Sequence, residues 1–323
     1  MIDLGKKNIR KISMLGPRAV YGMALTDLVA ENNKVYAVSA DLGVSSGLAR
    51  LMDSMPDRYI NVGIAEQNMI GIAAGMAKEG LIPFVSSFAP FASLRCADQI
   101  RMNMGYMHLP VKITALGSGV SMGLLGYSHY GLEDIALLRA IPNIVILSPA
   151  DCASVAKAVY AAADIEEPVY IRLTGEPGMP VVYNEEPVFN IGKANVLKEG
   201  NDIAIISTGS MVRQSLDAAS LMEEMGYSVS AIDMHTIKPL DFETVDCIAR
   251  KSQFVVTVEE HSKIGGLGSA VAEYLLEAGI NVHFLRIGLN DRYGKAGDYK
   301  YMLEQNGLTK GKIVDLITSK IGH

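Results

Sequence analysis

The sequence predicts an α/β fold of two doubly wound domains, each a mainly parallel sheet with helices on both faces. Short apolar runs rich in β-branched residues alternate with longer helical stretches along most of the chain. The length of 323 residues is enough for two such domains. The alternation stops at residues 174–200, where prolines and carboxylates predict a connecting segment. We therefore place one domain at residues 1–184 and the other at residues 185–323.

The first domain is expected to be a set of strands separated by helices. The strands are expected at residues 34–40, 58–62, 81–87, 111–116, 143–148 and 168–173. The helices are expected at residues 65–79, 92–107, 131–139 and 151–164. The helix over 65–79 has the clearest signal, because its apolar residues recur at helical spacing and Gly80 ends it.

The second domain repeats the same alternation without any visible sequence repeat of the first. Its strands are expected at residues 202–208, 227–233, 253–259 and 280–286. Its helices are expected at residues 210–225, 241–250 and 268–278. Gly226 ends the first of these helices. The pattern therefore predicts a second doubly wound domain.

Composition excludes several classes of protein. The formal net charge of -6 argues against a nucleic-acid partner, because phosphate backbones select a basic face. No apolar run approaches the roughly 18 residues that indicate a membrane span, and the first ten residues lack the apolar core of a signal peptide. The three cysteines are an odd number without a CxxC pair, so we expect reduced thiols. We expect a cytoplasmic protein with neither nucleic acid nor membrane as a partner.

The sharpest local feature is the segment Asn-Val-Gly-Ile-Ala-Glu-Gln-Asn-Met at residues 61–69. It places Glu66 at the start of an otherwise apolar helix. An acid in the first turn is favoured by the helix dipole, and this alone would explain the residue. The pattern therefore leaves open whether Glu66 has a structural or a catalytic role.

This segment resembles the motif that carries the activating glutamate of the transketolase family. Other segments match the family in the same order along nearly the whole chain. They are Ser39–Leu42, Ser87–Phe91, Asp98–Arg101, Gly126–His129, Leu132–Asp134, Ile171–Arg172 and Ile237–Leu240. The matches cover the pyrimidine-binding and C-terminal domains of a full-length transketolase. No Gly-Asp-Gly signature for magnesium and diphosphate occurs in the sequence. The chain thus resembles the C-terminal subunit of a split transketolase.

The resemblance implies thiamine diphosphate as the cofactor. Glu66 would hydrogen-bond the pyrimidine ring and favour its reactive imino tautomer. Phe91 would stack on the aminopyrimidine, with Phe88 lining the same pocket. Asp41, which ends an apolar strand and could also be an ordinary helix cap, would lie close to the thiamine. A separate N-terminal subunit would hold the diphosphate and Mg²⁺, and we expect an α2β2 assembly with like chains paired about a two-fold axis.

Four residues are expected at the sugar substrates. His129 matches a histidine that faces the cofactor and the donor oxygens, so we expect a catalytic and positioning role. Arg18, Ser45 and Arg172 match positions that bind the sugar phosphate, for which arginine forks are well suited. Without the resemblance, a surface salt bridge would explain Arg18 equally well. His261 matches a family residue of the C-terminal domain that is remote from the cofactor.

Two positions depart from the family pattern. Leu125 stands where relatives have an aspartate that meets a donor hydroxyl, and leucine cannot accept a hydrogen bond. Gly117 stands where long-chain relatives have a phosphate-contacting histidine. The stretch between Phe91 and Asp98 is also one residue longer than in long-chain transketolases. We expect a donor other than standard xylulose phosphate, with a branched sugar such as apulose phosphate as one candidate.

Three functions remain open at this point. The first is the split transketolase, which transfers a two-carbon ketol unit between sugar phosphates. The second is a relative of deoxyxylulose-phosphate synthase or the beta subunit of a 2-oxo acid dehydrogenase, which share the fold and a comparable glutamate. The third is a non-catalytic scaffold or regulatory subunit. The Gln-Asn-Met after Glu66 favours transketolase, and Glu66, Phe91 and His129 together argue against a decayed site.

Overall fold

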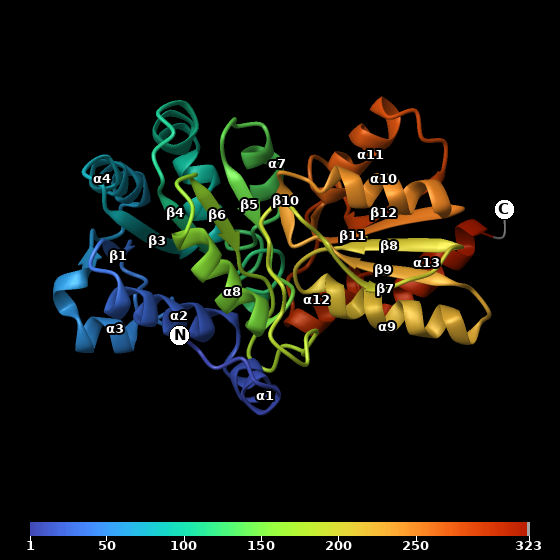
Figure 1. Cartoon of the computed structure of the whole chain (residues 1–323), viewed down its shortest axis with the longest axis horizontal. Coiled ribbons are helices and arrows are strands. Elements are labelled where there is room, and N and C mark those ends of the chain that lie inside the picture. The colour runs from blue at the N-terminus through green and yellow to red at the C-terminus, as the bar shows by residue number, and fades with distance from the viewer. Residues whose placement is uncertain (322–323) are drawn as a thin grey trace.

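Each predicted domain is built on its own sheet in the computed structural model, which describes residues 1–321, and the two lobes lie side by side along the longest axis (Figure 1). The first sheet has the order β10-β5-β6-β4-β3-β1-β2. The second has the order β12-β11-β8-β9-β7. Non-sequential neighbours joined by helices are the mark of doubly wound domains, so the predicted fold class is confirmed.

The first domain supplies six mutually parallel strands to its sheet. They are β1 (Val35–Ser39), β2 (Tyr59–Asn61), β3 (Ile82–Phe88), β4 (Lys112–Leu116), β5 (Val145–Leu147) and β6 (Val169–Arg172). Strands β4, β5 and β6 are buried along their whole length. Burial on both faces explains why they form near-continuous apolar runs in the sequence.

Helices cover both faces of this sheet. One core joins the sheet to α1 (Lys6–Leu15), α2 (Pro17–Glu31), α3 (Ala49–Ser54) and α8 (Cys152–Ala163). The other joins it to α4 (Glu66–Lys78), α5 (Ala89–Ala92), α7 (Asp134–Arg139) and two helices of the second domain, α10 (Phe242–Lys251) and α11 (Leu267–Glu277). This second core is therefore shared between the domains.

The second domain has four parallel strands and one antiparallel edge strand. They are β8 (Ile203–Ser207), β9 (Val229–Asp233), β11 (Phe254–Ser262), β12 (His283–Leu289) and the edge strand β7 (Asn195–Lys198). Besides α10 and α11, its helices are α9 (Met211–Glu224), α12 (Tyr299–Gln305) and α13 (Lys310–Ile321). Helices α9, α12 and α13 pack together on one face.

The short strand β10 (Thr236–Lys238) crosses from the second domain to the first. It pairs antiparallel with β5, opposing Thr236 to Leu147 and Lys238 to Ile146. The Lys238 ammonium also donates to backbone carbonyls of Arg139 and Ile141. Pairing of this kind covers a sheet edge that would otherwise present unpaired backbone groups.

The connecting segment is fixed to both domains. Residues 173–194, all of them described, form neither helix nor strand. The Asp151 carboxylate accepts from the backbone N–H groups of Val182 and Tyr183, each at 2.9 Å. The Tyr183 hydroxyl donates to the Asp233 carboxyl at 2.6 Å. The segment thus reaches from α8 of the first domain to β9 of the second.

One predicted helix is broken. Residues 92–107 were expected to form a single helix, but α5 ends at Ala92 and Ser93 leaves helical geometry. A 3₁₀ turn (Leu94–Cys96), a short α6 (Ala97–Gln99) and a π-helix (Ile100–Tyr106) follow. The longer spacing noted in the sequence falls at this break, which lies next to Phe91.

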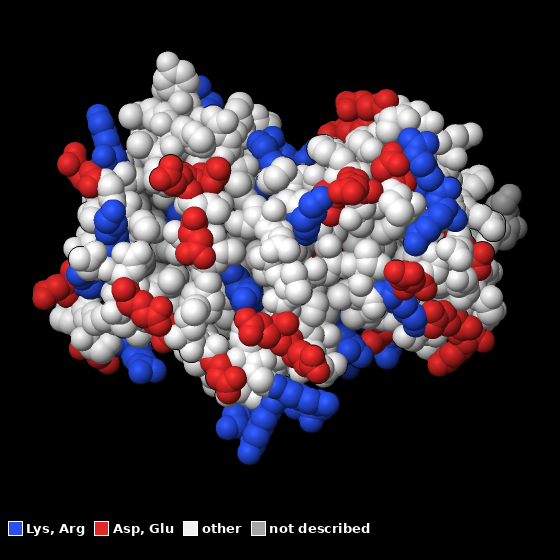
Figure 2. Space-filling model, in the orientation of Figure 1, with Lys and Arg blue, Asp and Glu red and all other residues white. Residues whose placement is uncertain are grey.

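The surface carries both charge signs. Figure 2 shows acidic and basic side chains interspersed over one face, with a group of basic side chains projecting near α1.

Within residues 1–321 we find no helix with both the length and the apolar character that crossing a membrane would require.

Candidate active site

Glu66 is the first residue of α4, where the chain leaves β2 through a tight turn. Gly63 takes a φ of 74° in this turn, which residues with a side chain rarely adopt. The Asn61 side chain accepts from the Gly63 N–H at 2.9 Å and from the Asp41 N–H at 3.1 Å. The Glu66 side chain is only 4% exposed. The turn thus places a nearly buried carboxyl at the start of α4, close to the end of β1.

Asp41 follows β1 at the edge where parallel strands end and α/β proteins bind ligands. It is exposed and has a φ of 58°. The Asn61 amide donates to its carboxylate at 3.0 Å. Asn61 therefore ties Asp41, after β1, to the turn at Gly63 that leads to Glu66.

Three aromatic rings stand beside this edge. Phe88 ends β3, Phe91 lies in α5, and His129 comes from the loop before α7. Their ring centroids are 6.2 Å apart for Phe88 and Phe91, 5.8 Å for Phe88 and His129, and 5.4 Å for Phe91 and His129. The Ser128 hydroxyl lies 3.0 Å from Nδ1 of His129. These half-buried rings, in edge-to-face contact, could line a pocket for a planar ligand.

Arg95 joins the carboxyl to the aromatic cluster, and the sequence did not identify it. Its Nη1 lies 2.9 Å from both carboxylate oxygens of Glu66. Its guanidinium carbon lies 4.0 Å from the centroid of the Phe91 ring. The only local signal was its place in the lengthened stretch after Phe91, and the helix break there made any spacing argument unsafe.

Arg18 and Ser45 come from elements that pack against each other. Arg18 lies on α2, half-buried, and this burial lowers the pKa of its guanidinium. Ser45 is exposed in the loop after β1. A side chain at Gly47 would come within 2.4 Å of the Arg18 carbonyl oxygen, so the loop can approach α2 only because Gly47 has none.

Arg172 does not lie where a phosphate could reach it, contrary to expectation. Its side chain is 1% exposed, and Nε donates to the Asp134 carboxylate at 2.9 Å. Its Nη2 donates to the carbonyl oxygens of Gly131 at 2.9 Å and Glu260 at 2.8 Å. The guanidinium is therefore a buried structural cation at the contact between the two domains. Arg172 ends β6, a strand that is buried along its whole length.

The two departures from the family pattern have different surroundings. Leu125 lies on the surface at the end of a 3₁₀ turn (Gly123–Leu125), four residues before His129. Gly117 has a φ of 62°, and a side chain there would meet the sulfur of Met122 at 2.1 Å. A histidine at Gly117 would have to adopt this left-handed backbone conformation and displace the Met122 side chain.

Two family models match the sequence and together cover most of it. "Transketolase, pyrimidine binding domain" matches residues 13–176, and "Transketolase, C-terminal domain" matches residues 192–313. The chain belongs to the transketolase family. It is therefore assigned to a family of thiamine diphosphate-dependent transferases, and the expected enzyme class is confirmed.

Similar transketolase-family proteins align with almost the whole chain. A "putative transketolase C-terminal section" of Methanocaldococcus jannaschii is 41% identical over 95% of this chain and 96% of its own length. The "6-deoxy-6-sulfo-D-fructose transketolase subunit SqwH" of a Clostridium species is 39% identical over 92% of each chain. One of the subunits of the apulose-4-phosphate transketolase of Actinobacillus succinogenes is 36% identical over 87% of this chain and 91% of its own.

A solved structure described as a "split gene transketolase, inactive beta4 tetramer" has the same fold. It superposes with a TM-score of 0.85 at 41% identity, over 94% of this chain and 97% of that chain. The family assignment therefore rests on sequence and structure together.

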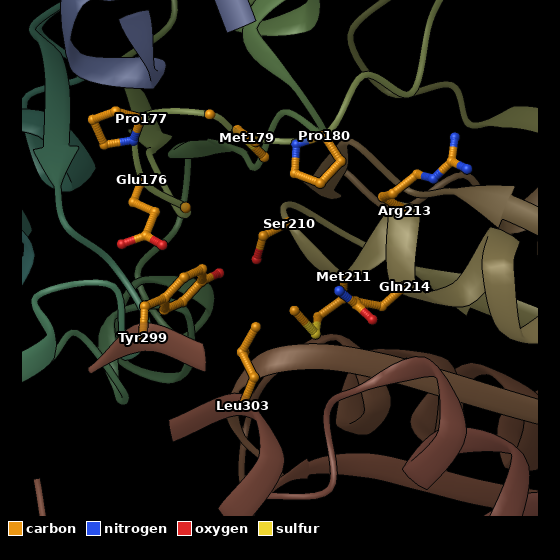
Figure 3. A pocket seen from close by; sticks show the side chains of 12 residues that line it. Glu176, Pro177, Met179, Pro180, Ser210, Met211, Arg213, Gln214, Tyr299 and Leu303 are labelled. Atoms are coloured by element: carbon orange, nitrogen blue, oxygen red, sulfur yellow. The ribbon is translucent and has the colours of Figure 1, made fainter. Parts of the chain in front are cut away.

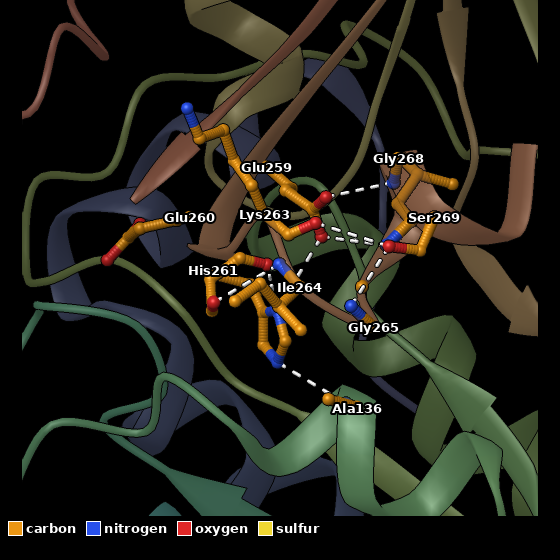
Figure 4. Close-up of polar contacts among 12 residues, drawn as sticks. Ala136, Glu259, Glu260, His261, Lys263, Ile264, Gly265, Gly268 and Ser269 are labelled. Atoms are coloured by element: carbon orange, nitrogen blue, oxygen red, sulfur yellow. Dashed lines mark hydrogen bonds and ion pairs between the residues drawn. The ribbon is translucent and has the colours of Figure 1, made fainter. Parts of the chain in front are cut away.

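The transketolase C-terminal domain meets the first domain through a buried polar junction. The Glu259 carboxyl accepts from the N–H groups of Leu267 and Gly268, while burial raises its pKa to about 7. His261 points toward α7, where its Nε2 accepts from the Ala136 N–H at 3.4 Å (Figure 4). Burial lowers the pKa of His261 to about 4, so the ring is neutral. His261 thus makes a contact between the domains, while Glu259 fixes the start of α11 within the second domain.

A cavity of about 90 Å³ lies at the same junction, between the connecting segment and helices α9 and α12. Glu176, Ser210 and Tyr299 face it (Figure 3). The hydroxyls of Ser210 and Tyr299 both donate to the buried Glu260 carboxylate. None of the predicted site residues lines this cavity, so it is separate from the Glu66 site.

Proposed function

We propose that the chain is the pyrimidine-binding subunit of a split transketolase that moves a two-carbon ketol unit from a ketose phosphate to an aldose phosphate. The observation that carries this proposal is the nearly buried Glu66 carboxyl, which Arg95 connects to the ring cluster of Phe88, Phe91 and His129. A carboxyl next to flat, partly exposed rings suits an aminopyrimidine, which offers both a ring nitrogen and an apolar face.

The residues fit the pyrimidine half of thiamine diphosphate. When bound, the cofactor supplies the nucleophilic carbon that adds to the donor carbonyl. Glu66 would hold a proton at the pyrimidine ring nitrogen and so fix its tautomer. Phe91 would stack on the ring with Phe88 beside it. Asp41 would lie near the thiamine, at the strand end that it shares with Asn61.

His129 is proposed to orient the donor and to exchange protons with its oxygens. Its ring is half-buried within the aromatic cluster, and Nδ1 lies 3.0 Å from the Ser128 hydroxyl. If Ser128 engages Nδ1, Nε2 is left as the polar atom available to a substrate. A positioned imidazole can serve as a general acid and base near neutral pH.

A second subunit is proposed to bring the diphosphate and Mg²⁺ site. Among residues 1–321, no group of three His, Cys, Asp or Glu side chains is arranged to hold a metal ion. Large apolar side chains stand exposed next to the site residues. They are Val44, Ile64, Leu94, Leu124 and Leu125. Exposed apolar groups around a polar site are typical of a surface that another chain covers, and we propose an α2β2 assembly acting in the cytoplasm.

The donor is proposed to differ from standard xylulose phosphate. Leu125 cannot accept a hydrogen bond from a donor hydroxyl, and Arg172 is buried in its pair with Asp134. Arg18 and Ser45 are left as the proposed phosphate contacts of this chain. Two relatives are named for a sulfonated fructose and for apulose phosphate, which supports a modified or branched ketose phosphate as donor.

The test is to purify the chain with its natural partner and assay the pair with ketose phosphates, including apulose phosphate, and with pyruvate. Glu66→Ala should reduce ketol transfer by about 10²-fold or more, because the cofactor loses its activating proton donor. Glu79→Ala is the matched control, since Glu79 is an exposed acid at the other end of α4.

Three results would contradict the proposal. A near-normal rate of Glu66→Ala would remove the assigned role of that residue. Release of carbon dioxide from pyruvate would indicate a synthase or dehydrogenase reaction instead. Absence of turnover by the wild-type pair with every donor would favour a scaffold or regulatory subunit.

A further inference from the structure

Arg95 occupies both contacts that the proposed function assigns to the aminopyrimidine. Its Nη1 reaches both oxygens of Glu66 at 2.9 Å. Its guanidinium lies over the Phe91 ring at 4.0 Å. A guanidinium and an aminopyrimidine are both planar, nitrogen-bearing groups, so Arg95 presents to the carboxyl and to the ring what the cofactor would present.

The two contacts cannot be shared with the cofactor. Glu66 is 4% exposed, so its oxygens have little access to any group besides Arg95. A carboxylate whose two oxygens accept from a guanidinium is not free to give a proton to a ring nitrogen. The Arg95 guanidinium must therefore leave before an aminopyrimidine can take its place.

The local backbone lets the side chain leave without unfolding the segment. The Ser93 hydroxyl donates to the Ala89 carbonyl at 2.6 Å, and the Cys96 sulfur lies 3.2 Å from the Phe91 carbonyl oxygen. The Gln67 amide donates to the Arg95 carbonyl at 3.0 Å. The backbone on both sides of Arg95 is thus fixed, while its side chain is 44% exposed and free on the solvent side.

We propose that Arg95 closes the pyrimidine site of the cofactor-free chain and is displaced from Glu66 and Phe91 when the aminopyrimidine binds. Arg95 is then a positioning residue that keeps the Glu66 carboxyl in place and paired until the cofactor arrives. This proposal rests on the proposed function, because it takes Glu66 and Phe91 as the aminopyrimidine contacts.

The experiment measures binding of the cofactor's pyrimidine half, 4-amino-5-(hydroxymethyl)-2-methylpyrimidine, to the full-length chain by ligand-observed NMR. In Arg95→Met the guanidinium is gone while a flexible apolar side chain remains. The dissociation constant of the fragment should be about fivefold to tenfold lower for Arg95→Met than for the wild type. This is the size expected for losing a competing cation–π contact and a partly exposed ion pair. Arg95→Lys keeps the charge without the planar fork and should fall between the two.

Arg101→Met is the matched control, because Arg101 is an exposed arginine of the same segment that pairs with the exposed Asp98. It should bind the fragment like the wild type. Phe91→Ala, combined with Arg95→Met, should abolish the gain if the fragment stacks where the cofactor is proposed to bind. Thermal unfolding of each variant, compared with the wild type, checks that the chain is folded.

The outcomes separate the two proposals. Equal or weaker binding to Arg95→Met, with binding lost in the Phe91→Ala double variant, would overturn the role of Arg95 and leave the pyrimidine site standing. Tighter binding that survives Phe91→Ala, or no binding to any variant, would overturn both. Tighter binding to Arg95→Met that depends on Phe91 supports both.

Discussion

The Arg172 guanidinium and the Asp134 carboxylate form an ion pair that is closed to solvent on both sides. The two atoms Nε and Oδ2 are 2.9 Å apart, and the side chains are 1% and 0% exposed. The Tyr170 hydroxyl donates to the same carboxylate at 2.8 Å. Because Arg172 also donates to the Glu260 carbonyl, the pair ties the pyrimidine-binding domain to the C-terminal domain.

Arg172→Met should therefore destabilise the whole chain. It leaves the Asp134 carboxylate buried without its cation, which typically costs about 3–5 kcal/mol of unfolding free energy. Urea unfolding followed by circular dichroism would measure this. Arg101→Met, which removes an exposed pair with Asp98, should cost less than about 1 kcal/mol. A similar small loss in both variants would show that the buried pair contributes little.

Asp233 should make stability depend on pH. Burial raises the pKa of its carboxyl to about 7, against the lowering effect of the hydrogen bond from Tyr183. The folded chain then keeps a proton that the unfolded chain loses from about pH 4 upward. The stability that this proton provides is complete below about pH 4 and is lost as pH rises to about 7.

The variant Asp233→Asn cannot titrate at this position, so it should gain stability relative to the wild type as pH rises from about 4 to about 7. Urea unfolding of both proteins at several pH values in this range would show the unfolding free energy of the wild type falling relative to that of Asp233→Asn. The pKa of Glu259 is also raised to about 7, but Glu259 is present in both proteins and cancels in the difference. Parallel stability curves would contradict the assignment.

Leu125→Asp should shift the choice of donor. The new carboxylate, on the surface four residues before His129, could accept a hydrogen bond from a donor hydroxyl that leucine cannot contact. We expect kcat/KM for xylulose phosphate to rise about tenfold relative to that for apulose phosphate, the size of one hydrogen bond to a charged group. The assay needs the complex with the partner subunit. An equal shift in Leu124→Asp, one residue earlier in the same exposed turn, would attribute the effect to surface charge alone.

The sequence predicted the elements whose signals are local. Helix α4 and strands β3, β4 and β8 lie within a residue or two of their expected bounds, because their apolar period and the following glycine or turn residues act within a short window. The prediction of a single helix over residues 92–107 was wrong, because the 3₁₀ turn and the π-helix there have a helical composition but a different geometry.

Other features depend on contacts between distant residues. Strand β10 is only three residues long and is defined by its pairing with β5, some ninety positions earlier in the chain. The burial of Arg172 depends on Asp134 and Glu260, which no spacing argument brings together. Arg95 was missed for the same reason, because its contact with Glu66 joins residues 29 positions apart, from the start of α4 to the 3₁₀ turn after α5.

Strand β10 joins the two family domains by backbone pairing, in addition to the connecting segment. Severing the connecting segment between residues 184 and 190 would not release the halves, because β10 would still hold the edge of the neighbouring sheet at β5. The first half produced alone would lack that strand and would offer β5 as a bare edge to other proteins. A gene divided at this connection would therefore encode two mutually dependent fragments.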